Sequence, residues 1–503
     1  MSSSLTVNID TSAQVGSGTN TKRSPPSGIS VLIVGAGPAG VYAALECWRK
    51  GHDVRIVERH PSASTEGDSF TITPQVIEHI RAYWPDMAEE NDRIAEDPWV
   101  SYHRITGERV AGPESFAFGM KKKAGLAEGE NKSKDGINYP SRMHRHNRPQ
   151  FLKMLISQLQ RLGIEIEYGL RAVDYYEEDE DDKKKAGVVF EDGRKLEADV
   201  VVAADGIGTK SHKLINGRDI RAWSSGWASA RAAFPVEVIT AIPELNERFK
   251  ILENGHPCVE MWQSPTVMMF LYRTRNIINW GAMHKDKGLA VENWHKSIEG
   301  EKVVELLEKA VPNYPEIAKK LIRATPDGAI VDWPLVWRNP QQVTTSPKGR
   351  VVQVGDAAHT FLPSSGSGAN QGIEDGIYLA SCLQLAGKDG LAWGTKVHST
   401  LRFERVSCCQ KLGLLNHERR VNANPTAKDP SKIKTEYGKW IWAHDPEKYA
   451  YDNYGKALDH VRSGAPFQNT NIPPGYVHRP WSVDQVMADI EAGKPLELEG
   501  DWS

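Results

Sequence analysis

A carboxylate, a loop of small residues and a helix start follow one another between Gly349 and Leu383, and together they could bind a flat or anionic ligand. Asp356 can accept hydrogen bonds from a sugar-like hydroxyl group. The loop from Thr360 to Gly368 is rich in Gly, Ser and Pro, so its backbone N–H groups can approach a ligand closely. A helix start adds free N–H groups and a partial positive charge. The stretch indicates a ligand site, with an ordinary strand–loop–helix crossover as the alternative.

The flanking residues predict the elements that position this site. Residues 351–354 form an apolar run that is typical of a buried strand. Beyond the loop, apolar residues recur at helical spacing at Ile373, Ile377, Ala380 and Leu383. The predicted order is therefore strand, acid, small-residue loop and helix.

A second glycine-rich turn lies near the start of the chain. The apolar run from Ile29 to Val34 is followed by Gly-Ala-Gly-Pro-Ala-Gly, a helical pattern and a second strand that ends at an acid. This order, with the acid about 20 residues beyond the glycines, predicts a βαβ unit that binds a dinucleotide. The motif alone does not separate NAD from FAD. The predicted binding residues are Gly35, Gly37, Ala39, Gly40, Glu58 and Arg59.

The stretch that contains Asp356 resembles the GD box of the class A flavoprotein monooxygenases, the group of p-hydroxybenzoate and salicylate hydroxylases. In that family the Asp holds the ribityl chain of FAD, the Pro and glycines line the isoalloxazine ring, and the helix start faces its pyrimidine edge. The resemblance implies that this chain binds FAD through Asp356, Pro363, Gly366, Gly368, Ala369 and Asn370.

Two further motifs resemble the same family. Arg148 begins an Arg-x-x-Phe-x-x-x-Leu helix that is similar to the family helix whose Arg approaches FAD, although a surface Arg at a helix start is the simpler alternative. Asp205-Gly206 resembles the family's DG box, which lies near the FAD pyrophosphate and is implicated in NAD(P)H use. The family usually continues Ser-x-x-Arg, whereas Thr209 and His212 stand at those positions, so this chain departs from the family pattern where nicotinamide contacts would be expected.

Strands without intervening helices follow from residue 223 to residue 283, which predicts an antiparallel sheet. Arg231 lies in a strand that resembles the family strand whose Arg can contact substrate. Tyr272 and His284 lie on or after neighbouring strands. These three residues are the catalytic candidates, although Arg231 could simply pair with an acid and Tyr272 could simply fill the core.

These patterns predict an α/β protein with a Rossmann-type FAD-binding domain, an inserted antiparallel-sheet substrate domain and a C-terminal helical region. The FAD-binding domain is expected to be discontinuous, over residues 29–105, 140–222 and 331–400. The remaining segments are a disordered tail (1–28), an irregular insertion (106–139), the substrate domain (223–330) and a C-terminal helix with an aromatic tail (401–503). The aromatic residues of the C-terminal tail are expected to pack onto the body of the protein, with a dimer contact as the alternative.

Composition narrows the class of protein further. The chain has 503 residues and a formal net charge of -3, so no bulk attraction to nucleic acid or anionic membranes is expected. It contains no apolar run long enough to span a bilayer, and residues 1–28 lack an apolar segment, so they are expected to be a tail and not a signal peptide. Its five cysteines form no CxxC pair, which favours a reducing compartment and a cytoplasmic location. No metal site is expected, and the oligomeric state is left open as a monomer or a homodimer.

The family resemblance implies an enzyme that uses NADPH or NADH and O₂. Reduced FAD would react with O₂ to a flavin C4a-hydroperoxide that hydroxylates, or epoxidises, an electron-rich aromatic or related small molecule. FAD is expected to be non-covalent, because no His or Cys stands out as an attachment point. The sequence as a whole resembles enzymes of fungal secondary metabolism. A flavin-dependent oxidase or a flavin-binding protein without oxygenation is the alternative, and no residue selects the substrate.

Overall fold

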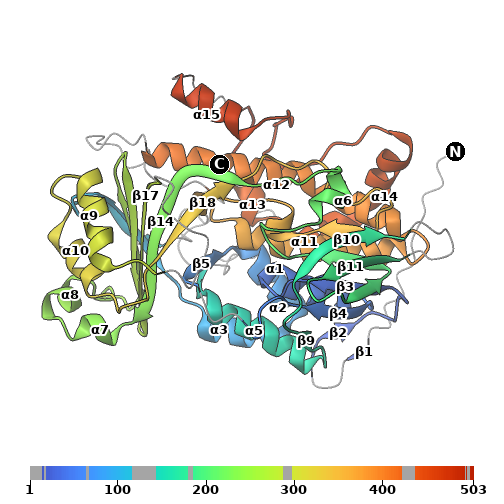
Figure 1. The fold of residues 1–503 in the computed structure, drawn as a ribbon, viewed down its shortest axis with the longest axis horizontal. Coiled ribbons are helices and arrows are strands. Elements are labelled where there is room, and N and C mark those ends of the chain that lie inside the picture. The colour runs from blue at the N-terminus through green and yellow to red at the C-terminus, as the bar shows by residue number, and fades with distance from the viewer. Residues whose placement is uncertain are drawn as a thin grey trace.

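The protein is represented by a computed structural model that describes residues 14–15, 19–63, 67–115, 143–178, 185–286, 297–421, 437–492, 494 and 499–502 (Figure 1). Its first layer is a parallel sheet with the strand order β19-β13-β3-β4-β9. The near-continuous apolar sequence of the central strands reflects burial on both faces. The strands are β3 (Ser30–Val34), β4 (Asp53–Val57), β9 (Ile166–Glu167), β13 (Val200–Ala203) and β19 (Val351–Gln353).

Helices cover one face of this sheet and a small antiparallel sheet covers the other. Alternate side chains of β3 divide between the two layers, since Ile33 packs among the helices and Leu32 packs against the small sheet. The helices are α1 (Pro38–Arg49), α2 (Pro74–Tyr83), α3 (Pro85–Ile94), α5 (Arg148–Arg161) and α11 (Gly368–Ala386). The small sheet consists of β10 (Ala172–Glu177), β11 (Ala186–Phe190) and β12 (Lys195–Ala198), and α6 (His212–Asn216) follows β13.

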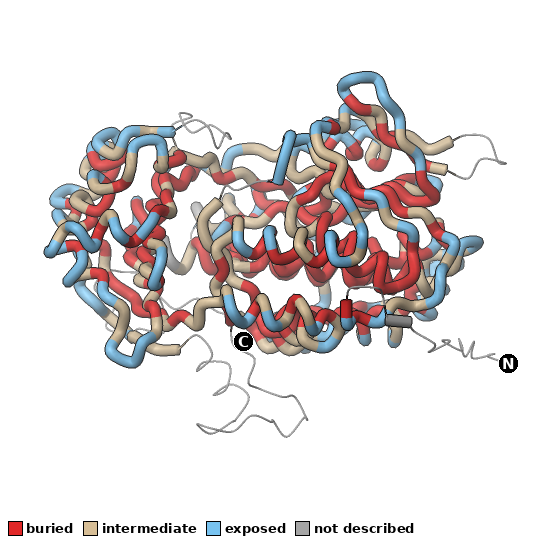
Figure 2. Tube along the Cα trace, turned by 90° about the horizontal axis from the view of Figure 1, so that it is seen from below, coloured by how far each residue is buried: buried red, intermediate tan, exposed pale blue. Residues whose placement is uncertain are grey.

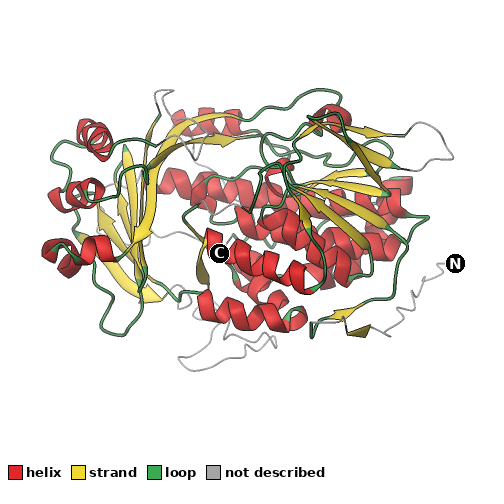
Figure 3. Ribbon diagram, turned by 60° about the horizontal axis from the view of Figure 1, so that its bottom comes forward, coloured by secondary structure: helices red, strands yellow, loops and turns green. Residues whose placement is uncertain are grey.

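A second, seven-stranded sheet forms the other end of the molecule, with the order β18-β14-β17-β16-β15-β6-β7. All neighbouring strands are antiparallel except the pair β6–β15. Short helices cover its outer face, and Figure 3 shows them on the side away from the parallel sheet. The strands are β6 (Trp99–Arg104), β7 (Arg109–Ser115), β14 (Trp223–Pro235), β15 (Cys258–Gln263), β16 (Val267–Arg273), β17 (Ile277–Lys285) and β18 (Val331–Trp337). The helices are α7 (Glu237–Thr240), α8 (Pro243–Arg248), α9 (Gly300–Ala310) and α10 (Glu316–Arg323).

The predicted domain boundaries require three corrections. Strand β6 lies in the second sheet, because its backbone pairs with β15, whose edge would otherwise carry unpaired groups. Strand β18 also belongs there, since it pairs with β14, so the chain returns to the FAD-binding domain only at β19. Finally, residues 19–28 are not a disordered tail: the Ser24 and Ser27 N–H groups donate to backbone carbonyls at the end of α1. Strand β7 occupies the start of the predicted insertion, and residues 116–142 lie outside the described residues.

The C-terminal region packs onto the body of the protein. Helix α12 (Leu391–Val421) lies against α11, and α13 (Lys439–Trp442), α14 (Pro446–Ser463) and α15 (Val483–Glu491) follow. The aromatic side chains of Trp440, Trp442 and Tyr454 are buried, as the sequence analysis predicted for this tail. Buried backbone runs through the interior of both halves and exposed segments form the rim (Figure 2). No helix within the described part of the chain is long and apolar enough to cross a membrane.

Candidate active site

A cavity of about 510 Å³ lies where the two halves of the protein meet. One wall comes from the glycine-rich turn of α1 and from residues 355–372, and the other comes from strands of the second sheet. Most of the cofactor residues predicted from the sequence line this cavity: Gly37, Ala39, Arg148, Gly206, Asp356, Pro363, Gly366, Gly368 and Ala369. Motifs more than 300 residues apart in the chain therefore meet at one site.

The glycine-rich turn has the shape that a closely approaching ligand needs. A Cβ built on Gly35 would lie 2.3 Å from the backbone oxygen of Ala204, and one built on Gly40 would lie 2.0 Å from the oxygen of Gly35. These two glycines let the turn and the helix start pack tightly. In contrast, nothing lies within 4 Å of a Cβ at Gly37, which faces the cavity. The turn thus leaves open space beside the N-terminus of α1, where an anionic pyrophosphate would be stabilised.

Glu58 stands at the end of β4, close to this turn. Its side chain accepts hydrogen bonds from the N–H groups of Ala36 (2.8 Å) and His60 (2.9 Å). Each carboxylate oxygen can accept a further bond, so a ribose hydroxyl could be held beside the turn. Arg59 is exposed, and its charge acts on Asp205 in the neighbouring loop.

We predict that Glu58→Ala weakens FAD binding about tenfold or more, because one or two hydrogen bonds to a charged acceptor are lost and the turn loosens. The measurement is titration of the apoprotein with FAD. Glu167→Ala, at the nearby end of β9, is the matched control and should bind FAD like the parent chain. An unchanged affinity for the Glu58 variant would remove this residue from the site.

Asp356 lies in the short helix η1 (Gly355–Ala357) directly after β19, and its side chain is open to the cavity. Desolvation by the surrounding protein raises the pKa of the Asp356 carboxyl group above its ordinary value, and the charges of Arg148 and Arg338 oppose that shift. The turn below it is fixed by Asp375, which accepts hydrogen bonds from the Gly355 N–H (2.8 Å) and interacts with His359 at 2.6 Å. Asp356 is therefore a positioned acceptor that has its free side toward the ligand space.

The N-terminus of α11 also faces the cavity, through Gly368 and Ala369. The preceding loop contains η2 (Pro363–Ser365) and Gly366, which has a left-handed φ of 58°. Asn370 does not line the cavity. Its side chain is buried, accepts from the Thr73 N–H and donates to the carbonyl oxygens of Thr71 and Gly366. Asn370 thus holds the loop in place from behind.

Arg338 does not line the cavity but supports two loops beside it, a role that the sequence analysis missed. Its buried guanidinium donates to the carbonyl oxygens of Ala357 (3.0 Å) and Ile207 (2.8 Å), so it joins the loops that follow β19 and β13. Burial lowers its pKa to about 10, while the charges of Asp356 and Asp205 oppose that shift. Asp205 itself accepts a hydrogen bond from the Tyr175 hydroxyl, and burial raises the pKa of its carboxyl group. The feature of the sequence that could have pointed to Arg338 is its position directly after β18, which contains Trp333 and Trp337.

The three catalytic candidates fall in different places. Arg231 lines the cavity, forms an ion pair with Asp68 at 3.5 Å and stacks its guanidinium over the Trp333 ring. Tyr272 is buried behind the cavity wall, and burial raises the pKa of its hydroxyl. His284 is also buried outside the cavity and hydrogen-bonds to Asp332 at 2.9 Å. Burial alone would lower the pKa of His284, but Asp332 raises it above the ordinary value. Only Arg231 is brought to the cavity.

The second-sheet wall is apolar and rich in methionine. Its members include Met261, Met268, Met269, Met283 and Phe270, and Met143, next to β8, also lines the cavity. A Cβ at Gly281 would lie 2.2 Å from the Phe270 ring, so this glycine makes room for the aromatic wall. Arg145 on β8 (His144–Asn147) also lines the cavity, and the sequence analysis missed it. Flexible methionine side chains suit a wall that adapts to a bulky apolar ligand.

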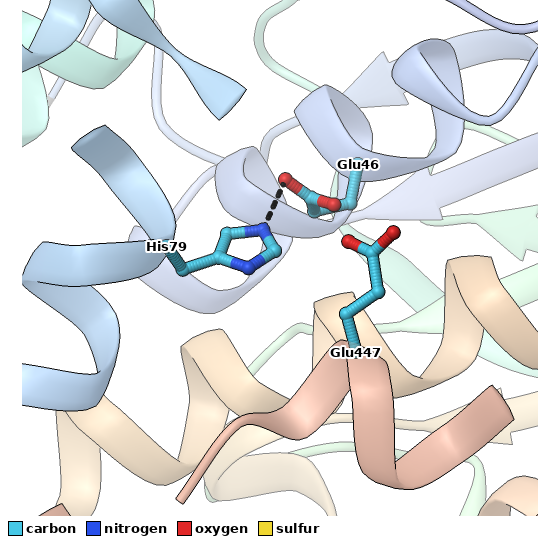
Figure 4. A group of neighbouring side chains, drawn as sticks. All are labelled: Glu46, His79 and Glu447. Carbon is cyan, nitrogen blue, oxygen red and sulfur yellow. Dashed lines mark hydrogen bonds and ion pairs between the residues drawn. The ribbon is translucent and has the colours of Figure 1, made fainter. Parts of the chain in front are cut away.

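Three side chains that could bind a metal ion lie together outside the cavity. They are Glu46, His79 and Glu447 (Figure 4). Their ligand atoms lie within 4.8 Å of one another. Glu46 interacts with His79 at 3.0 Å, and Arg49 and Lys50 donate to Glu447. Arg49 also donates to Glu46, so two cations already balance the two carboxylates. We interpret the group as an ion-pair clamp between α1 and α14.

Buried carboxylates predict acid sensitivity. Burial alone would raise the pKa values of Glu46, Glu374 and Asp375, but their basic partners, which include Arg49, Arg405, His359 and Arg402, lower all three well below the ordinary range. Their stabilising effect is complete above the unfolded-state pKa of about 4 and is lost as the pH falls below that value toward the folded-state pKa values, by up to about 1.4 kcal/mol per pH unit for each group. Burial lowers the pKa of His398 to about 4. Because its unfolded-state pKa is about 6.5, protonation of the unfolded chain also lowers the stability of the protein as the pH falls below about 6.5.

We therefore expect the thermal midpoint to fall moderately between about pH 6.5 and pH 4, where His398 acts, and more steeply below about pH 4, where the carboxylates act, measured by differential scanning fluorimetry. Glu374→Gln should lower the midpoint at pH 7 and make its pH dependence shallower. A midpoint that does not change down to pH 4 would contradict this explanation.

The residues at the cavity fit FAD. Two helix N-termini, an open glycine turn, acceptors at Glu58 and Asp356, and a deep cavity between them supply the donors, acceptors and space for a dinucleotide with a flat ring. No second glycine-rich βαβ motif was found in the sequence, so a separate site for NAD(P)H is not indicated.

Known proteins place the chain in one family. A profile of the FAD-binding domain family matches residues 28–392. FAD-dependent monooxygenase fsr3 of Gibberella fujikuroi is 42% identical over 487 residues, which cover 96% of this chain and 91% of that protein. The crystal structure of CtdE in complex with FAD and substrate 4 aligns with a TM-score of 0.74 at 28% identity, over 86% of this chain and 99% of CtdE.

A salicylate hydroxylase–substrate complex shares the fold, with a TM-score of 0.62 at 20% identity over 84% of this chain and 97% of that chain. The chain belongs to the FAD-binding domain family and, within it, to the FAD-dependent monooxygenases of the class A flavoprotein type. The predicted family and the FAD cofactor are confirmed.

Proposed function

We propose that this enzyme uses NAD(P)H and O₂ to hydroxylate, or epoxidise, an electron-rich aromatic or related small molecule of secondary metabolism. The observation that carries the proposal is the shared cavity, which is polar and glycine-lined on the side of α1 and α11 and apolar on the side of the second sheet. This division suits a cofactor ring on one side and an aromatic substrate on the other. Bound FAD would supply the redox chemistry with O₂.

The chain's own residues would orient the reactants and exclude water. Asp356 and Glu58 would accept hydrogen bonds from cofactor hydroxyls, and Arg148 lines the cavity, where its charge acts on Asp356. The N-terminus of α11 would stabilise negative charge that develops on the ring. The methionine and aromatic wall keeps water from the substrate side. Arg231 would contact the substrate from β14, with Asp68 holding its guanidinium.

The test is a panel of aromatic compounds added to the FAD-loaded enzyme. A substrate should stimulate NADPH or NADH oxidation and yield a product heavier by one oxygen atom in mass spectrometry. Oxidation that yields only hydrogen peroxide with every compound would instead favour an oxidase. Non-covalent FAD, a cytoplasmic location and a monomer or homodimer are further parts of this proposal. Acid precipitation should release a yellow supernatant.

A further inference from the structure

Arg145 is a half-buried cation for which the described residues supply no ion-pair partner. Its guanidinium lines the cavity, and its one side-chain hydrogen bond within the described residues is to the Thr71 hydroxyl, at 3.3 Å. Its Nε atom is buried without a hydrogen-bond partner in that part of the chain. A buried guanidinium without a partner is costly, so such groups normally meet an anion.

Two aromatic rings lie against the guanidinium of Arg145. The guanidinium lies 5.9 Å from the centre of the Phe270 ring and 5.2 Å from that of Tyr272. These cation–π contacts fix its orientation without neutralising its charge. Phe270 lines the cavity as well, so the guanidinium and the apolar wall meet at the same place.

Arg231 provides the contrast within the same cavity. Its guanidinium forms an ion pair with Asp68, at 3.5 Å. The charge of Asp68 also acts on Arg145, but at no ion-pair distance. Of these two arginines, Arg231 forms the ion pair with Asp68. The positive charge of Arg145 is therefore available to a ligand in the cavity.

We propose that Arg145 is a specificity-determining residue that binds an anionic oxygen of the aromatic substrate. The inference rests on the proposed function, because it assumes that the substrate occupies the wall formed by the second sheet. A planar guanidinium donates charge-assisted hydrogen bonds to a carboxylate, phenolate or enolate oxygen. A phenolate or enolate oxygen also donates electron density to the attached ring, which favours transfer of an electrophilic oxygen to it.

The test uses two isosteric probes, 2-naphthoate and the neutral 2-naphthamide, which perturb the flavin spectrum of the FAD-loaded enzyme on binding. The parent enzyme should bind naphthoate about tenfold or more tightly than naphthamide, because a charge-assisted hydrogen bond is gained. Arg145→Met should abolish this preference, and Arg145→Lys should retain part of it. Arg171→Met, which removes an exposed arginine on the small sheet, is the matched control and should keep the full preference.

Two further readouts separate this role from others. Arg145→Met should retain the parent's FAD content and should not lower the thermal midpoint of the apoprotein, because the charge it removes has no carboxylate partner in the described structure. Loss of FAD would make Arg145 a cofactor residue and overturn the proposal. An unchanged preference for naphthoate in Arg145→Met, or no preference in the parent, would also overturn it. The probe titrations require no turnover, so failure to find an oxygenated product would count against the proposed function and not against Arg145.

Discussion

Asp356→Ala should be purified with little bound FAD, and the flavin that remains should oxidise NAD(P)H without oxygenating substrate. The side chain is open to the cavity and held by a turn that Asp375 fixes from behind. Each lost hydrogen bond to a charged acceptor weakens binding by about 1.5–3 kcal/mol, or roughly 10- to 150-fold. A loosely held ring would also lose its alignment with the substrate, so reducing equivalents would leave as hydrogen peroxide.

The stability of the apoprotein distinguishes this role from a structural one. Folding raises the pKa of Asp356, so its ionised form costs stability at neutral pH and the alanine variant should melt at the same temperature or higher. The measurements are flavin per chain and the ratio of product to NAD(P)H consumed. Asp327→Ala, in an exposed turn, is the control and should match the parent. Full flavin content and full coupling in Asp356→Ala would exclude it as a flavin ligand.

Gly35→Ala and Gly37→Ala should fail in different ways. At Gly35 the added methyl group would lie 2.3 Å from the oxygen of Ala204, on a backbone with φ of 112°. We expect a loss of more than about 3 kcal/mol, from strain and overlap together. At Gly37 nothing lies within 4 Å and φ is -74°, so the variant should fold normally. Its methyl group would enter the cavity and weaken FAD binding.

Thermal unfolding of the apoproteins and FAD titration check this pair. Gly35→Ala should show a much lower midpoint or fail to accumulate, whereas Gly37→Ala should keep the parent's midpoint and lose FAD affinity. Gly455→Ala is the control, because it lies exposed on α14 with open space around it and should leave both quantities unchanged or raise the midpoint. Equal behaviour of the Gly35 and Gly37 variants would contradict the geometry assigned to the turn.

The parts of the site that depend on local sequence order were predictable. The run before Gly35 and the run before Asp356 each place a turn at the end of a buried strand, and parallel strands bring those ends to one edge of a sheet. The family resemblance then assigned the ligand. The pairing of strands that are distant in sequence was not predictable. Strand β6 pairs with β15 and β18 pairs with β14, and no local sequence pattern indicates which distant strand will be the partner.

Long-range placement also explains why only one of the three catalytic candidates lines the cavity. Tyr272 and His284 lie on correctly predicted strands, but which face of a strand meets the cavity depends on register. Arg145 and Arg338 carry no motif of their own, because their roles arise from loops and rings that are distant in sequence. The roles of Arg145 and Arg338 are seen only when the charged groups around them are located in the structure.

The central claim, that this cavity directs oxygen from O₂ into an organic substrate, is tested most directly by isotope labelling. A compound that stimulates NAD(P)H oxidation is incubated with the FAD-loaded enzyme under ¹⁸O₂ in unlabelled water. The account predicts a product that contains one ¹⁸O atom, with hydrogen peroxide as a minor product. A product that carries oxygen from water, or hydrogen peroxide in the same amount as NAD(P)H consumed with no labelled product, would contradict it.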